Sequence, residues 1–501
     1  MQSGLDDPKV YQLLQKGYTQ NIFQFSSKGM TKFLVSMQPD KIEDLIAANA
    51  LFRPATLDSG STDKYVDCKL GDADPVYLWG TYNAMKNTYG VLCYQEQLAQ
   101  IAREVGKFSL GEGVKLVKLI SKKKVDKILA LRDKFMAGAN ENGCPKEDAE
   151  AIWHMFEVAG GYLFNKSHAT AYAVTAYAGA YLKANYPTAF YTIALQWAKD
   201  DEIPTLMSEM ELCSEAKIVP PDINVSGGTF ITDYETNKIF WSLSRIKMLG
   251  AKATEWIINE RNVRGEFSSI ENFIERIFRY KLKLYKYWDD PDNPNEATKC
   301  PVNARHVRHL ILSGCFDKVE NAQSVIERYA ILEKAAKCLG FEISEKDIPE
   351  DLRNKHYFWS QQQIAISGIG AIDYKRIYDN SEAKPQIKGK ASWALLKNIQ
   401  DPDYDGKRVA ICANIVDIEE KKFKDKKTGE NRVFCKLLLQ QNNDLVEMVI
   451  WNDEWMNVRA TLCKGGSLSS AKNKMLICSA QVKYSDYTGG NNLQLYKSSI
   501  I

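Results

Sequence analysis

Hydrophobic positions recur at helical spacing over most of the first 380 residues and alternate near the C-terminus. Apolar residues three and four apart predict helices over 10–17 and 41–50. An Ala/Tyr-rich run that ends at Pro187 predicts the longest helix, because Ala favours helix and proline stops it. The alternating stretches predict five strands, Val409–Ile418, Val433–Leu439, Leu445–Trp451, Met475–Lys483 and Leu493–Tyr496. A shorter β-like run, Val91–Tyr94, leads into a further helix.

These elements predict a multidomain α+β protein. A chain of 501 residues is too long for one ordinary domain. Pro220-Pro221 ends the helical first part, because neither residue can continue a helix. We therefore expect a mainly α-helical domain over 1–218, a smaller domain over 219–318, a helical connector over 319–390 and a five-stranded barrel of the OB type over 391–501.

Composition indicates an ordinary globular protein of a reducing compartment. The hydrophobic fraction is 45%, the charged fraction is 26% and the net charge is +3, so a nucleic-acid-binding surface would need uneven placement of the cations. The eleven cysteines form no Cys-x-x-Cys pair, which favours free thiols. With no membrane-length apolar run and no signal peptide, we expect a cytoplasmic protein without a membrane partner.

A polar cluster stands where the longest predicted helix begins. Asn165, Lys166, Ser167 and His168 follow a glycine pair and precede the Ala/Tyr-rich run. The N-terminus of a helix carries unsatisfied N–H groups and partial positive charge, which suit a phosphate. The alternative is that Asn165 and Ser167 are helix caps and that Lys166 is solvated.

A basic segment precedes this cluster in the chain. Its lysines are Lys115, Lys118, Lys122, Lys123, Lys124 and Lys127. Leu116, Leu119 and Ile120 keep one face apolar, so the segment is either a phosphate-binding surface or a solvated helix face.

A helix-hairpin-helix is predicted where Ile246–Gly250 turns into the helix that contains 253–261. Such a hairpin offers backbone N–H groups to a DNA phosphate without reading sequence, and its candidate contacts are Lys247, Gly250 and Lys252.

Two patterns that resemble metal sites are weak. His306 and His309 have no carboxylate or cysteine partner nearby. The calcium-loop-like stretch 401–406 lacks the glutamate of the twelfth position, where Cys412 stands.

The predicted barrel carries a basic first turn, 421–427, and several aromatic residues. This combination predicts single-stranded DNA binding, in which bases stack on aromatic rings and lysines neutralise phosphates. The candidates are Lys421, Lys422, Phe423, Lys424, Phe434 and Trp451, with Tyr484 as a further ring. The alternative is that most of these rings fill the barrel.

Several of these motifs resemble the bacterial C-family replicative polymerases, the α subunits of DNA polymerase III. Their fingers read Gly-Tyr-Gly-Phe-Asn-Lys-Ser-His before a tyrosine-bearing helix, and residues 161–168 differ from that pattern at Leu163. Further matches are Phe23, Gln24, Ser27, Gly29, Met30, Arg53, Pro54 and the tetrapeptide 94–97. The OB-type domain stands at the family's relative position.

The resemblance implies fingers over 1–218 and a duplex-binding domain over 219–318. It also implies a site for the incoming deoxynucleoside triphosphate (dNTP). The implied dNTP residues are Lys118, Lys122, Lys123, Lys124, Tyr162, Asn165, Lys166 and His168. Val117 and Lys118 replace two family arginines, and lysine supplies only a point charge where arginine grips phosphate with a planar fork.

The family's palm carboxylates, which hold two Mg²⁺ ions, have no counterpart in these 501 residues. We therefore expect no catalytic residue and no metal ligand in this chain. It is expected to act with a palm-bearing polypeptide, primer–template DNA and a single-stranded template, as half of a split, phage-type replicative polymerase in the cytoplasm of a bacterial or phage-infected cell. Two alternatives stay open, a non-catalytic DNA-binding accessory protein and a piece of a longer polymerase. Residues 317–390 hold no Gln-x-x-Leu-Phe-type peptide, which leaves a sliding clamp open as a partner.

Overall fold

The computed structural model forms two compact units, residues 1–187 and 188–501, and each is described by itself. The described residues are 4–121, 125–160, 162–278, 300–370, 374–379, 381, 391–424, 429–442, 444–463, 466–472, 474–485 and 490–495. Lys122, Lys123 and Lys124 of the predicted dNTP site lie outside them.

The first unit is built from helices. They are α1 (Pro8–Gln15), α2 (Lys28–Met37), α3 (Ile42–Leu51), α4 (Pro54–Asp58), α5 (Ser61–Leu70), α6 (Tyr82–Met85), the 3-10 turn η1 (Lys86–Thr88), α7 (Gln95–Glu104), α8 (Leu110–Ser121), α9 (Val125–Glu141), α10 (Lys146–Ala159) and α11 (Lys166–Asn185). The predicted end of the long helix before Pro187 is confirmed. The predicted strand 91–94 is reduced to a single bridge between Tyr94 and Phe164.

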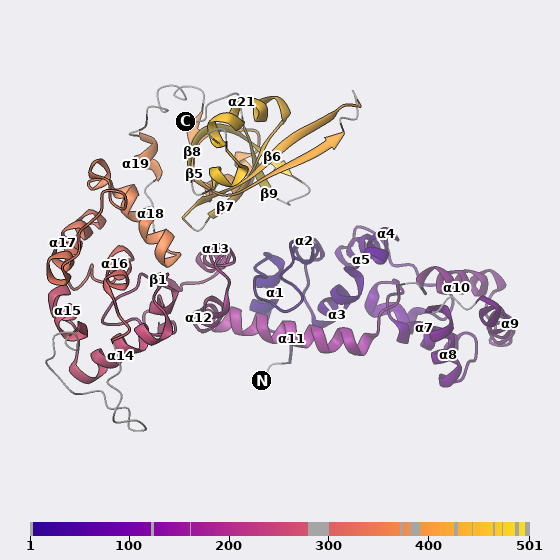
Figure 1. Ribbon diagram of the computed structural model, residues 1–501. Coiled ribbons are helices and arrows are strands. Elements are labelled where there is room, and N and C mark those ends of the chain that lie inside the picture. Colours follow the sequence, from indigo (N-terminus) through magenta and orange to yellow (C-terminus); the bar gives the residue numbers. More distant parts are fainter. Residues whose placement is uncertain are drawn as a thin grey trace. The chain divides into compact units, whose positions relative to one another are not determined.

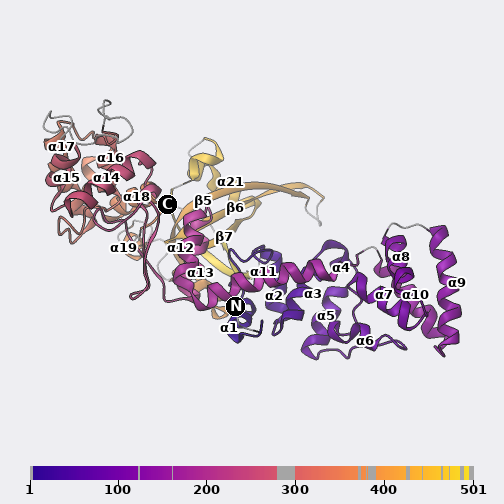
Figure 2. The same cartoon turned by 90° about the horizontal axis from the view of Figure 1, so that it is seen from below.

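Helix α11 is the long magenta helix along which α1 and α3 pack (Figures 1 and 2). Its buried face consists mainly of small residues, Ala169, Ala173, Ala176 and Ala180, which allow the neighbouring helices to approach closely. Tyr177 and Lys183 are the large side chains among its buried residues, and Lys183 is the charged one. It is only 1% exposed, and its Nζ donates to the carbonyl oxygens of Tyr18 and Gln20 at 3.0 and 2.8 Å.

The second unit begins with α12 (Pro187–Trp197) and α13 (Ile203–Cys213) and continues into a small sheet in the order β1-β3-β2. Its further elements before the barrel are β1 (Lys217–Val219), β2 (Ile231–Asp233), β3 (Lys238–Phe240), η2 (Leu243–Arg245), α14 (Ala251–Arg264), α15 (Ile270–Phe278), α16 (Ala304–Leu312), η4 (Val325–Glu327), α17 (Arg328–Leu339), η5 (Glu350–Leu352), α18 (His356–Ser367) and α19 (Tyr374–Asp379). One hydrophobic core joins α14 to α18, so α17 and α18 of the predicted connector share the core of the hairpin domain.

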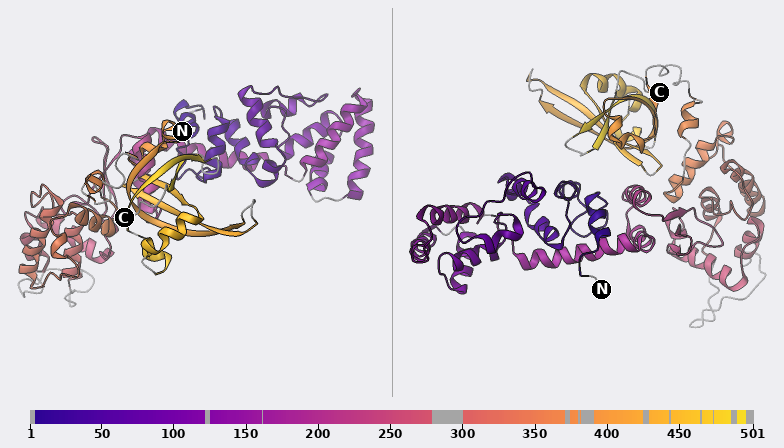
Figure 3. Two further views of the ribbon diagram at one scale, coloured as in Figure 1. Left: turned by 90° about the horizontal axis from the view of Figure 1, so that it is seen from above. Right: turned by 180° about the vertical axis from the view of Figure 1, so that it is seen from behind.

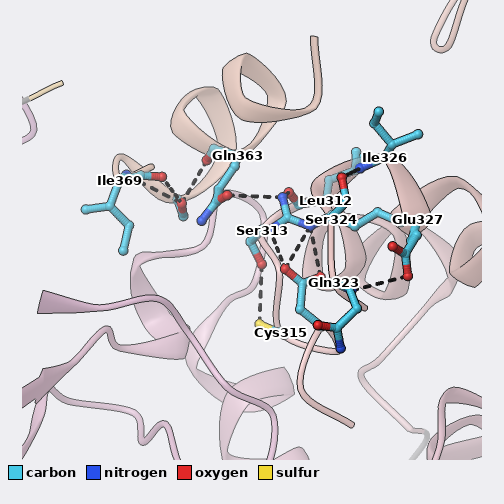
Figure 4. Close-up of polar contacts among 12 residues, drawn as sticks. Leu312, Ser313, Cys315, Gln323, Ser324, Ile326, Glu327, Gln363 and Ile369 are labelled. Carbon is cyan, nitrogen blue, oxygen red and sulfur yellow. Dashed lines mark hydrogen bonds and ion pairs between the residues drawn. The ribbon is translucent and has the colours of Figure 1, made fainter. Parts of the chain in front are cut away.

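A buried arginine links three segments of this core through hydrogen bonds. Arg328, which is 2% exposed, pairs with Asp317 through two guanidinium nitrogens. It also donates to the Leu312 carbonyl and to Gln363 Oε1, at 3.2 and 3.1 Å (Figure 4). These bonds tie the start of α17 to the end of α16 and to α18, because a buried charge is tolerated only where it is paired and fully hydrogen-bonded.

The predicted OB-type barrel is confirmed. Its elements are β4 (Ser392–Trp393), η6 (Asn398–Gln400), η7 (Pro402–Tyr404), β5 (Arg408–Lys424), β6 (Asn431–Gln441), β7 (Asp444–Ile450), α21 (Asn452–Cys463), η8 (Leu468–Ala471), β8 (Met475–Ser485) and β9 (Gly490–Leu495). Strands β5, β6, β7, β9 and β8 follow one another, and β8 pairs back onto β5 to close the sheet. The predicted basic turn begins later than expected, because residues 421–424 extend β5 and pair with β6. This pair of strands projects from the barrel as a ribbon (Figure 3).

No disulfide joins any of the eleven cysteines, all of which are in described segments. Among the described residues, no helix has the length and apolarity needed to cross a bilayer, and no group of three or more His, Cys, Asp and Glu side chains could hold a metal ion.

Candidate functional site

The N-terminus of α11 begins with a side-chain cap. Asn165 has extended backbone angles, and its Oδ1 accepts a hydrogen bond from the His168 amide at 2.9 Å. This is the capping geometry that the alternative interpretation of the cluster predicts. The cap also places Asn165, Lys166 and His168 together at the head of α11.

A carboxylate from α7 already occupies this helix end. Glu96 Oε2 accepts from the Lys166 amide and Oε1 accepts from Asn165 Nδ2, both at 2.9 Å. A negative group here is favourable, because the helix end carries partial positive charge. The amides of Lys166 and His168 are already hydrogen-bonded and cannot bind a ligand. A phosphate at this helix end would therefore contact the side chains of the cluster. Glu96 lies in the tetrapeptide 94–97, but no pattern along the chain predicts its contact with Lys166.

Lys166 and Tyr162 make further contacts near the head of α11. Lys166 is half-buried, and its Nζ lies 5.5 Å from the ring centre of buried Tyr94, a cation–π arrangement. Tyr162 accepts a hydrogen bond from Arg53 at its carbonyl oxygen, at 3.3 Å, and its hydroxyl lies 3.3 Å from Ser61 Oγ. The predicted dNTP residues Tyr162, Asn165, Lys166 and His168 therefore stand at or just before the start of α11.

A cleft of about 340 Å³ separates α7 from α8 beside the helix end. It is lined by Gln95, Glu96, Ala99, Gln100, Arg103, Leu110, Val114, Val117 and Asn165. Val117 and Asn165 thus border the same cleft, which brings the basic segment that contains Lys118 next to the head of α11. Lys118 itself is exposed on α8. The relation of Lys122–Lys124 to the cleft is not described, since those residues are outside the described range.

In the second unit, the hairpin turn bears the predicted duplex contacts. Lys247, Gly250 and Lys252 are all exposed around the start of α14. Gly250 precedes α14 without a capping side chain, so no N-cap side chain pairs with the first-turn amides. Met248 takes a left-handed backbone conformation, with φ of 72°, at a position where glycine would be relaxed.

Two histidines from α16 hold this hairpin. His309 Nδ1 lies 2.6 Å from the Lys247 carbonyl oxygen, and a hydrogen bond links His306 to the Met248 backbone. His306 Nδ1 in turn accepts from the Asn303 amide at 3.3 Å. Burial and the neighbouring His309 lower the pKa of His306, in keeping with a ring nitrogen that accepts a hydrogen bond. Their role is structural.

On the barrel, three candidate rings form one cluster. Phe423, Phe434 and Trp451 have ring centres 5.4 to 5.8 Å apart. They lie where the β5–β6 ribbon leaves the barrel, outside the barrel core, and Trp451 is 45% exposed. Lys421, Lys422 and Lys424 are exposed on the same ribbon. Tyr484 is exposed on β8 and makes no ring contact with these three.

Two family models match the chain. One, the bacterial DNA polymerase III alpha subunit finger domain, matches residues 2–143, and the other, a helix-hairpin-helix motif, matches residues 215–286. The second match lies over the predicted hairpin.

Curated relatives are DNA polymerase III α subunits. The Aquifex aeolicus protein is 35% identical over 334 residues, which cover 66% of this chain and 27% of the relative. The Thermus aquaticus protein is 36% identical over 54% of this chain and 23% of its own length. The Escherichia coli protein is 28% identical over 97% of this chain and 41% of its own length. The chain thus spans well under half the length of these relatives. It is related to the bacterial-type C-family DNA polymerases, the α subunits of DNA polymerase III, in a part that includes their finger domain and helix-hairpin-helix motif.

Proposed function

We propose that this chain is the fingers and DNA-binding part of a replicative DNA-directed DNA polymerase. In this proposal, the first unit binds the incoming dNTP, the hairpin domain binds primer–template duplex and the barrel binds the single-stranded template. A separate, palm-bearing polypeptide supplies the catalytic carboxylates. The observation that carries the proposal is the gathering of Tyr162, Asn165, Lys166 and His168 at the head of α11, in a unit whose first part matches the finger domain.

The charge of a triphosphate supports this assignment. A dNTP brings several negative charges, and fixed cations normally share their neutralisation with metal ions in phosphoryl-transfer sites. Asn165 and Val117 line the cleft beside α7, and each is followed in the chain by a lysine, Lys166 and Lys118. The two groups of cations would therefore approach the triphosphate from different elements.

Mg²⁺ enters the proposal only through the partner. The described residues contain no group of three or more carboxylate, histidine or cysteine side chains that could hold a metal ion. The proposal therefore assigns no reaction step to this chain. Its proposed work is to bind and orient the nucleotide and the DNA.

Primer extension tests the division of labour. The purified chain with primer–template, dNTPs and Mg²⁺ should give no extension, and addition of a palm-bearing polypeptide from the same source should restore it. Robust extension by the chain alone would overturn the proposal. DNA binding without any rescue by a palm-bearing polypeptide would favour the accessory-protein alternative.

Substitution of Lys166 tests the nucleotide site in the assembled enzyme. Loss of one charge-assisted contact of about 1.5–3 kcal/mol lowers kcat/KM for the nucleotide by roughly ten- to a hundredfold. Lys166→Ala should show this loss with little change in primer–template affinity. Lys146→Ala is the matched control, because Lys146 is also the first residue of a helix. If folded Lys166→Ala keeps an unchanged kcat/KM for the nucleotide, the assignment of the triphosphate to this site is wrong.

A further inference from the structure

Four aromatic rings form a row along the first turns of α11. His168 and Tyr172 are four residues apart and so share one face of α11, and Phe164 stands just before the helix. Their ring centres are 5.6 Å apart for Phe164–His168 and 4.1 Å apart for His168–Tyr172. Phe23 continues the row, 5.0 Å from Tyr172, and the Arg53 guanidinium lies 4.9 Å from the Phe164 ring at the other end.

The row lies at the surface of the first unit. Phe23 is 47% exposed, His168 is exposed, and Phe164 and Tyr172 are half-buried. A chain that only needed to bury apolar area would place such rings in the core. Partly exposed rings beside cations are instead the combination with which proteins hold nucleobases, because every base offers a π-face for stacking.

The loop before α2 is built to present Phe23. Ile22 and Phe25 are buried at 1% and 0% exposure, and they anchor the loop on either side of the exposed ring. Asn21 and Gln24 take left-handed conformations, with φ of 56° and 63°, that side-chain-bearing residues rarely adopt. Such strain persists only where the surrounding structure enforces it, and it clusters at functional sites.

Buried Lys183 supplies that enforcement from the far half of α11. Its hydrogen bonds to the Tyr18 and Gln20 carbonyls hold the start of the same loop. A buried ammonium is costly unless fully bonded, so its use here indicates that the loop position matters. Lys183 is a positioning residue in this arrangement.

We infer that the row from Phe23 to Phe164 is a nucleobase-stacking surface that serves the nucleotide site at the head of α11. The inference rests on the proposed function. It assigns the base of the nucleotide to the aromatic row and the phosphates to Lys166 and its neighbours. His168 joins the two parts, since its amide is capped by Asn165 and its ring contacts that of Tyr172 at a tilt of 42°. Stacking contacts the face of a base and makes no hydrogen bond to its edge, so the row is expected to bind every base.

Fluorescence of 2-aminopurine tests the row, because stacking quenches this base. The full chain is titrated with 2-aminopurine deoxynucleoside triphosphate in one arm and with a single-stranded oligonucleotide that carries one 2-aminopurine in the other. Loss of stacking of one base weakens binding roughly tenfold. Phe23→Leu combined with Tyr172→Leu should lose quenching and affinity in one arm, which then identifies the source of the base. Phe23→Trp should retain both.

Two controls make the result specific. Tyr186→Leu alters another exposed ring, at the other end of α11 and about 21 Å from Tyr172, and should change neither arm. Inorganic tripolyphosphate, which has no base, should bind the wild-type chain and the row variants equally. Unchanged quenching in both arms, or a parallel loss of tripolyphosphate binding, would overturn the inference. Lys166→Ala separates the two assignments. If it leaves tripolyphosphate binding intact while the row variants lose quenching, the row stands and the phosphate site fails.

Discussion

Glu96 and Lys166 come from helices α7 and α11 and meet through a single 2.9 Å hydrogen bond from the Lys166 amide to the carboxylate. The bond places a negative charge at the point where the sequence predicts a phosphate. It stabilises the start of α11 in the absence of ligand, because an acidic group at a helix N-terminus offsets the helix dipole. It also opposes a triphosphate through like-charge repulsion.

Removal of this charge should therefore strengthen triphosphate binding. Glu96→Gln removes the repulsion between the carboxylate and a nearby phosphate. In water-like surroundings this repulsion is about 1 kcal/mol or less, so its loss corresponds to two- to fivefold tighter binding of a dNTP. The measurement is competitive displacement at low and high ionic strength, and the gain should shrink with salt. Glu147→Gln, in the first turn of α10, is the matched control and should change nothing. Weaker dNTP binding by Glu96→Gln would mean that the carboxylate only caps the helix.

The barrel should bind single-stranded DNA through two separable contributions. Replacement of Phe423 and Trp451 by Leu removes stacking, so affinity should fall roughly tenfold at every salt concentration. Replacement of Lys421, Lys422 and Lys424 by Ala should instead lower the dependence of affinity on salt, by a slope of about 2, because fewer counterions are released. Tyr484→Leu serves as the control, as this exposed ring lies outside the cluster. Equal salt slopes for wild-type and lysine-substituted protein would contradict the assignment.

Acid should destabilise the hairpin domain through His306. Its pKa lies below the ordinary 6.5, so the unfolded chain binds a proton that the folded domain resists. The free energy of unfolding should therefore fall as the pH drops through 6.5 toward the folded pKa. His306→Gln keeps an acceptor for the Asn303 amide without titrating, and it should reduce the difference in Tm between pH 7.5 and 5.5. A pH profile identical to wild type would show that other groups control this range.

Lys183→Met should destabilise the first unit. The substitution leaves the Tyr18 and Gln20 carbonyls without their donor, and an unsatisfied buried acceptor costs about 1–3 kcal/mol. Urea unfolding measures the loss, and limited proteolysis should show cleavage near residue 23. Lys146→Met, on an exposed lysine, is the control. Unchanged stability and cleavage would mean that the loop does not depend on Lys183.

The sequence by itself determined the elements whose signals are local. The end of α11 at Pro187, the Asn165 cap and the alternation of the five barrel strands all depend on neighbouring residues, and all are present in the structure. Short sequence motifs were enough to predict the family and the helix-hairpin-helix, because both predictions depend on the order of residues along the chain. The same local rules were misleading at 91–94, since a β-like run forms a strand only where a partner strand is available.

Only the tertiary structure decided which distant residues meet. Glu96 is 70 residues from Lys166, and Phe23 is far from Tyr172 in the chain. The burial of Lys183 is equally invisible in an Ala/Tyr-rich pattern. On the barrel, the register of β5 on β6 and the end of β7 bring Phe423, Phe434 and Trp451 together outside the core. Such contacts arise from the packing of whole elements, and no spacing along the chain encodes them.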